Sequence, residues 1–183
     1  MYEVTIVTLI MMIVLGTAIP SLTAVLRSYR SFGDAKSISN EMSLARMRAA
    51  ADFTRTRVYF DLNAMTYQLQ TYNKSTSQFQ LEGGIENLST NDSFGFGAIT
   101  TAAGTQTTIG QPSACLNSAG SVISNTACIL FNSRGIPVDT TGAVTSNDSI
   151  YLSDGSGGYF AVTASPSGRV AAYHYTGSSW HAS

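Results

Sequence analysis

The feature that most constrains the fold is the N-terminal segment, residues 1–26, which is almost entirely apolar. No charged residue occurs from Val4 to Ile19, and one acid, Glu3, precedes this run. A carboxylate at the start of a membrane-length helix is costly unless it pairs with another group or reaches water. The segment therefore predicts a helix that is buried in a bilayer or among other subunits.

The helical pattern does not stop at Pro20. Apolar residues recur at spacings of three and four along one stripe, which consists of Ala35, Ile38, Met42, Ala45, Ala49 and Phe53. This spacing predicts one helix from about residue 2 to about residue 54, kinked near Gly16 and Pro20. The alternative is two helices with a break at residues 31–33.

From Val58 onward the apolar pattern alternates, as in strands. Residues 58–62 and 66–72 are joined by Asn63 and Ala64, which predicts a β-hairpin. Other alternating runs are found at residues 127–132, 149–154, 158–165 and 168–175, and residues 82–112 are expected to form a loop with one short strand at 94–99.

The sequence thus predicts three parts in an α+β fold. Residues 1–26 would form a hydrophobic transmembrane or filament-core helix, and residues 27–57 the amphipathic second half of the same helix. Residues 58–183 would form a β-rich extracytoplasmic head whose antiparallel sheet packs against the helix.

The charge distribution argues against a nucleic-acid-binding head. Only 11% of the residues are charged. Residues 1–57 hold seven basic residues and four acids, whereas the rest of the chain holds three basic residues and seven acids. An acidic head gives little electrostatic attraction for nucleic acid or an anionic membrane surface.

The two cysteines, Cys115 and Cys128, suit a disulfide in an oxidising compartment. They lie in a polar, Gly- and Ser-rich stretch, and a bond between them would stabilise the fold by roughly 3 kcal/mol. In a cytosolic protein they would instead be two free thiols. A metal site is not expected, because there is no CxxC and only His174 and His181 could supply imidazole ligands.

We find no catalytic constellation. The string Asp-Gly-Ser-Gly-Gly at residues 154–158 superficially resembles the surroundings of a serine-protease nucleophile, but its position between two alternating runs predicts a hairpin turn. His174 is interpreted as a strand residue, and His181 is expected to be disordered. Asp139, Asp148 and Asp154 match no known calcium-binding spacing and are interpreted as surface-loop residues.

Several motifs resemble those of type IV pilin-like proteins. Glu3 and Pro20 are seventeen residues apart, like the glutamate and proline of the pilin N-terminal helix, and residues 18–21 read Ala-Ile-Pro-Ser. Residues 45–62 are similar to the "AR-x-x-A … R-x-x-V" signature of the GspH/FimT group of minor pseudopilins and minor pilins. The group's "F-x-x-x-G" turn and terminal "Gly-Arg-Val" strand are similar to residues 131–135 and 168–170.

The resemblance implies a structural subunit of a type IV pilus or a type II secretion pseudopilus, with no enzymatic activity and no cofactor. Glu3 would pair with the N-terminus of a neighbouring subunit, and the alternative is an interfacial acid that reaches water. Gly16 and Pro20 would let the helix loosen as it leaves the bilayer.

Expected partners are other copies of this chain or other pilin-like subunits, the inner membrane before assembly, and an assembly platform. The head would lie in the periplasm, and later at the cell surface or in a periplasmic pseudopilus.

Two other classes of function are considered. Some FimT-type minor pilins bind DNA through a Gly-Arg-x-Arg motif, but residues 168–171 read Gly-Arg-Val-Ala, so the second arginine is absent. A membrane-anchored periplasmic enzyme lacks any candidate site. Neither class accounts for Glu3.

Overall fold

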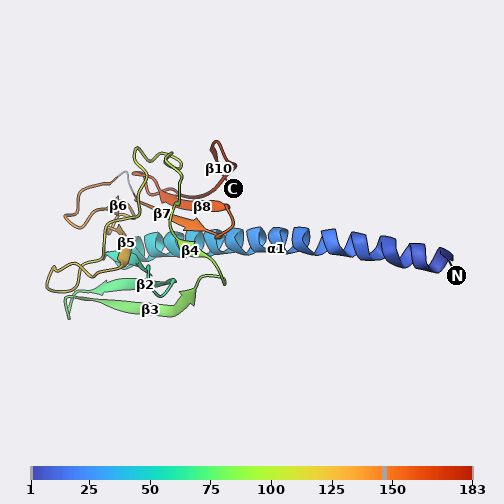
Figure 1. Ribbon diagram of the computed structural model, residues 1–183. Coiled ribbons are helices and arrows are strands. Elements are labelled where there is room, and N and C mark those ends of the chain that lie inside the picture. The colour runs from blue at the N-terminus through green and yellow to red at the C-terminus, as the bar shows by residue number, and fades with distance from the viewer. Residues whose placement is uncertain (1, 146–147, 183) are drawn as a thin grey trace.

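The computed structural model describes residues 2–145 and 148–182, except for the side chains at positions 3, 15, 17–21 and 24. The fold consists of one long helix, α1 (Tyr2–Ala51), and two five-stranded antiparallel sheets. The helix has 50 residues and is therefore about 75 Å long. Figure 1 shows that its N-terminal half projects from the molecule, whereas its second half lies within the head. The predicted α+β class is confirmed.

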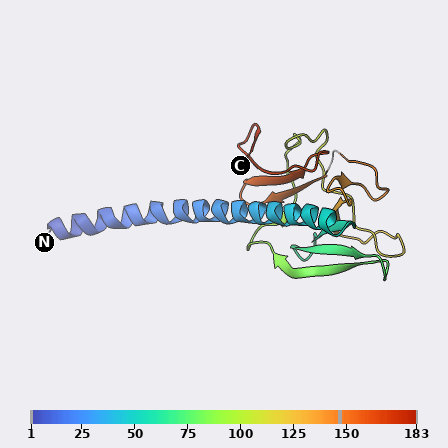
Figure 2. The same ribbon diagram turned by 180° about the vertical axis from the view of Figure 1, so that it is seen from behind.

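Helix α1 is a single element. It runs without a break through residues 31–33, so the alternative of two shorter helices is wrong. It also continues through Gly16 and Pro20, and Figures 1 and 2 show a gentle curve along the projecting half.

The helix ends at Ala51, before both its predicted end near residue 54 and the boundary of its predicted second half at residue 57, because the chain turns into a capping motif. The Thr54 amide donates to the carbonyl oxygen of Ala49 at 3.2 Å, and Phe53 has a φ of 48°, in the left-handed region. This is the geometry of a Schellman C-cap. The turn leaves Phe53 75% exposed, so its predicted place on the apolar stripe is wrong.

The other members of the predicted stripe are buried. Ala35, Ile38, Met42, Ala45 and Ala49 are each at most 1% exposed. They form one side of the main core cluster, which also contains Val58, Phe60, Leu69, Ile129, Ile150 and Val162 from the two sheets. The helical spacing of three and four therefore predicted the buried face of α1 as far as the capping turn.

The two sheets lie on either side of the second half of α1 (Figures 1 and 2). The first has the strand order β3-β2-β1-β5-β6, with β1 (Thr56–Asp61), β2 (Thr66–Asn73), β3 (Gln78–Asn87), β5 (Thr126–Phe131) and β6 (Pro137–Val138). The second has the order β10-β9-β8-β7-β4, with β4 (Ser93–Phe94), β7 (Asp148–Ser153), β8 (Tyr159–Ala164), β9 (Val170–Tyr175) and β10 (Trp180–Ala182). The sequence predicted one sheet, and the structure divides it into two because the helix inserts between them.

Most predicted strands are confirmed. The β1–β2 hairpin turns at residues 62–65, where the Asp61 carboxylate accepts hydrogen bonds from the amides of Asn63 and Ala64. The short strand predicted at 94–99 is wrong beyond Phe94, where β4 ends, and three strands were missed: β3, the two-residue β6 and β10. β3 extends into the predicted loop. It was missed because its residues are mostly exposed and show no clear apolar alternation. β10 places His181 opposite His174, so the expected disorder of His181 is wrong.

Three pieces of the sequence signature meet at one joint in the head. Gly135, in the turn after β5, and Gly168, before β9, both pack against Arg46 of α1. Both glycines have positive φ, 70° and 80°. A Cβ on Gly168 would overlap the Gly135 carbonyl oxygen. The joint thus links the helix with a turn of each sheet, and only a residue without a side chain fits at Gly168.

We expect Gly168→Ala to lower the free energy of unfolding by about 2–4 kcal/mol, because it combines an unfavourable φ with a backbone clash. Gly177→Ala is the matched control, since Gly177 also has positive φ (91°) but open space around it. It should cost only about 1 kcal/mol. Urea denaturation of both variants measures the difference, and equal losses would contradict the proposed contact.

Candidate functional site

The projecting half of α1 exposes apolar side chains on every side. Residues 9–14 form a continuous apolar run that covers more than one full turn, and each is exposed by 54% or more. The other exposed apolar residues of this half are Tyr2, Val4, Ile6, Val7, Leu22, Val25, Leu26 and Tyr29. A helix that is apolar all round is normally buried in a larger body, so this surface is the first candidate for function.

Among the residues whose side chains the structure describes, no helix is both long and apolar enough to cross a membrane. The transmembrane role of residues 1–26 therefore stays a prediction.

The three predicted assembly residues all lie in α1. The side chain of Glu3 is outside the described part of the chain, so its pairing stays a prediction. At Gly16, a Cβ would meet nothing within 4 Å. The backbone of Pro20 is helical, although its side chain is outside the described part. The role of Gly16 and Pro20 in loosening the helix also stays a prediction.

Where the helix enters the head, two polar side chains hold it to the loop between β3 and β4. Ser31 is fully buried, and its hydroxyl donates to the Asp92 carboxylate at 2.8 Å. One turn further, the Asp34 carboxylate accepts hydrogen bonds from the amide and hydroxyl of Ser89, at 2.6 and 3.0 Å. These bonds define a polar junction, formed by Ser31, Asp34, Ser89 and Asp92, between the projecting helix and the head.

Sequence reasoning missed the junction. The available signal was that Ser31 lies four residues before Ala35 and thus extends the buried stripe with a polar residue. Its partner, Asp92, lies 61 residues further along the chain, and nothing in the sequence identifies it.

The junction contains a carboxyl group with a perturbed pKa. Burial is the main cause that raises the pKa of Asp92 to about 6, and the nearby carboxylates of Asp34 and Asp154 act in the same direction. The hydrogen bond from Ser31 opposes the shift. A protonated Asp92 can donate a hydrogen bond to Asp34, whereas the ionised form repels it.

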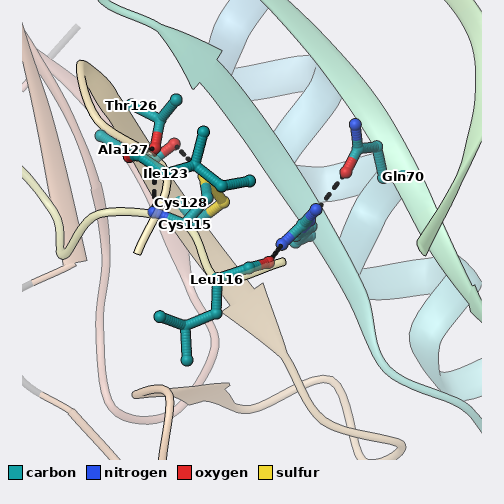
Figure 3. Close-up of a disulfide and its surroundings, with 8 residues drawn as sticks. Gln70, Cys115, Leu116, Ile123, Thr126, Ala127 and Cys128 are labelled. Carbon is teal, nitrogen blue, oxygen red and sulfur yellow. Dashed lines mark hydrogen bonds between the residues drawn. A yellow bond between two sulfur atoms is a disulfide. The ribbon is translucent and has the colours of Figure 1, made fainter. Parts of the chain in front are cut away.

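The predicted disulfide between Cys115 and Cys128 is confirmed (Figure 3). It fixes the loop before β5 to β5 itself, and the Cys128 amide donates to the Ser113 carbonyl oxygen at 2.9 Å. The Thr126 hydroxyl accepts a hydrogen bond from the Cys115 amide at 3.0 Å and donates one to the Ile123 carbonyl oxygen at 2.7 Å.

Two of the sequence features examined for catalytic or metal-binding chemistry, residues 154–158 and Asp139, form turns in the structure. Residues 154–158 form the β7–β8 turn, as predicted, with the Asp154 carboxylate accepting from the amides of Ser156 and Gly158. Asp139 closes its own turn through Thr141 and Ala143. Within the described chain, no group of three or more His, Cys, Asp or Glu side chains is placed to hold a metal ion.

The solved structures to which this chain is similar include two of the minor pseudopilin EpsH from the type II secretion system of Vibrio cholerae. The first has a TM-score of 0.49 and 12% sequence identity, and the match covers 77% of this chain and 94% of that chain. The second has a TM-score of 0.46 and 12% identity, with 78% and 92% covered.

No protein-family model matches the sequence. No curated protein matches it either.

The pH dependence of stability should report on the junction. Because the pKa of Asp92 is raised in the folded state, folding takes up a proton between about pH 4 and pH 6. This contribution to stability is present near pH 4 and is lost as the pH rises through 6.

We therefore expect Asp92→Asn, which keeps an acceptor for Ser31, to be more stable than the wild type at pH 7. The gain should be on the order of 1–2 kcal/mol and should shrink toward pH 4. Comparing the two proteins by urea denaturation at several pH values isolates this group from other titrating residues. A stability difference that does not change with pH would contradict the assignment.

Proposed function

We propose that this chain is a structural subunit of a helical filament of the type IV pilus or type II secretion pseudopilus class. The observation that carries the proposal is the apolar surface around the projecting half of α1. The head forms its own core, which begins on the helix at Ser31 and Ala35, and none of the preceding residues whose side chains the structure describes is part of that core. Their exposed apolar side chains would be buried by a partner other than the head of the same chain.

Packing against other helices would satisfy this surface. A side chain such as Ile10, which is 54% exposed, contributes about 1.5–3 kcal/mol when it becomes fully buried. In a helical filament, the projecting helices of successive subunits would bury one another's apolar surface and leave the heads outside. The sequence motifs around Glu3 and Pro20 support the same arrangement.

Glu3 would set the register of the filament. An ion that is left unpaired in an apolar core costs several kcal/mol, so pairing with the N-terminal amine of a neighbour favours one axial position over others. Before assembly, we propose that the helix resides in the inner membrane with the head in the periplasm, and that an assembly platform transfers it to the filament.

A charge placed in the middle of the apolar surface should block assembly without affecting the head. We expect Ile10→Lys to be excluded from filaments, because a lysine in the core would be desolvated without a partner. Val122→Lys is the control, since Val122 is also an exposed apolar residue, at 66%, but lies on the head. Filaments sheared from cells that make them, separated by sedimentation and probed for this chain, measure incorporation. Equal incorporation of the two variants would refute the filament-core role.

Glu3 can be tested by co-expression. We expect Glu3→Ala to enter filaments far less than a tagged wild-type copy in the same cells, because it offers no partner for the neighbouring amine. Glu86→Ala, which removes an exposed carboxylate from β3, should enter normally. Electron microscopy with labelled antibody locates both. If Glu3→Ala enters as well as the wild type while Ile10→Lys is excluded, the pairing is wrong and the filament role stands.

A further inference from the structure

A cavity of about 560 Å³ lies on the outer face of the first sheet, the face turned away from α1. Its floor includes Arg55, which directly precedes β1, Arg57 of β1, Tyr72 of β2 and Phe79 of β3, and part of its wall is the loop that the disulfide closes. Because the disulfide fixes this loop to β5, the wall is held in place independently of any ligand. Neither the proposed filament role nor the junction uses this cavity.

Arg57 is the most unusual residue of the cavity. It is only 7% exposed, yet its guanidinium bonds to neutral acceptors: Nε donates to the Gln70 side-chain oxygen at 2.7 Å and Nη1 to the Leu116 carbonyl oxygen at 2.9 Å (Figure 3). Its face also lies 4.0 Å from the centre of the Phe79 ring. Among the described residues, no carboxylate is within ion-pair distance of it. Burial therefore lowers the pKa of Arg57 to about 10.

Arg55 adds a second cation at the same end of the cavity. It directly precedes β1, and its carbonyl oxygen accepts a hydrogen bond from the Tyr72 amide at 2.8 Å, so Arg55 continues the pairing with β2 and lines the same cavity as Arg57. The Arg55 guanidinium lies 4.6 Å from the centre of the Tyr72 ring, and Tyr72 packs edge-to-face against Phe79. Arg55 is exposed and bonds to no residue of the disulfide loop that the structure describes. Support of this loop therefore does not account for a cation at position 55.

The cavity also reaches a buried acid, Asp148. It is 6% exposed, and its Oδ2 has no hydrogen-bond partner among the described residues. Burial and the nearby Asp139 raise the pKa of Asp148 to about 7, so its carboxyl group is partly protonated at neutral pH and can donate a hydrogen bond. Polar residues such as Gln111 and Ser113 also line the cavity. The cavity therefore combines two cations at one place with neutral hydrogen-bonding groups elsewhere.

We propose that this cavity binds a small organic carboxylate of the size of a sugar acid or an amino acid, with its carboxylate on Arg57 and Arg55. A carboxylate is the planar acceptor that a guanidinium binds best, and it would supply the counter-charge that Arg57 lacks. The remaining polar groups of such a ligand would meet the hydroxyl, amide and protonated carboxyl groups of the cavity. The volume lies within the usual range for small-molecule sites.

Calorimetric titration of the full chain, kept in solution by a polyoxyethylene detergent, tests the proposal. The probes are D-glucuronate and L-glutamate, each paired with its uncharged counterpart, D-glucose and L-glutamine. We expect saturable binding of at least one carboxylate and at least about tenfold weaker binding of its neutral counterpart, because the charged hydrogen bonds are lost. Which carboxylate binds identifies the sugar-acid or the amino-acid source.

Two variants assign the site. Arg55→Gln and Arg57→Gln should each weaken binding about tenfold or more, whereas Arg134→Gln, which removes an exposed cation outside the cavity, should leave it unchanged. Thermal unfolding reports whether each variant still folds. If the loss of the Leu116 contact unfolds Arg57→Gln, the exposed Arg55 variant decides. The proposal is overturned if neither carboxylate binds, if the neutral probes bind equally well, or if Arg55→Gln binds like the wild type.

Discussion

The structure depends on the burial of one stripe of α1 between two sheets. Neither sheet makes a complete core alone, because the helix residues from Ala35 to Ala49 occupy the space between them. Small side chains at three of these positions let the strands come close to the helix axis, while Ile38 and Met42 fill the remaining volume. The joint at Arg46 and the capping turn at Phe53 connect this inserted segment to the strands.

The two halves of the helix therefore differ in how their apolar side chains are covered. In the second half an apolar stripe is matched by the sheets and a polar face meets water. In the first half, the apolar side chains that the structure describes between Val4 and Val14 are each exposed by more than half. The polar junction around Ser31 and Asp92 lies between these two parts and ties the projecting segment to the head by hydrogen bonds, beside the apolar contact of Phe32 with the core. Such a division suits a subunit whose head folds independently and whose helix is finished by its neighbours.

The outer face of the first sheet is organised by different forces. Strand alternation sends Val58 and Phe60 toward the helix, and the same alternation sends Arg57 and Tyr59 away from it. The disulfide loop then covers Arg57 and removes water from a charged group that has only neutral partners. In β1, Val58 and Phe60 thus contribute to the core, whereas Arg57 on the opposite face lines the cationic cavity.

The sequence by itself predicted the long helix with its buried stripe, most strands and the disulfide, because each follows from local periodicity or from residue type; the structure decided that the helix has no break at residues 31–33. It also predicts that Glu3, Gly16 and Pro20 act in assembly, from the motif resemblance and the cost of a charge in an apolar core, and these roles stay predictions. Only the tertiary structure decided the rest. The exposed strand β3, the pairing of Ser31 with Asp92, the contact of Gly135 with Gly168 across Arg46, and the burial of Arg57 join residues far apart in the chain. No local period encodes such contacts, since they arise only when the helix inserts between the two sheets.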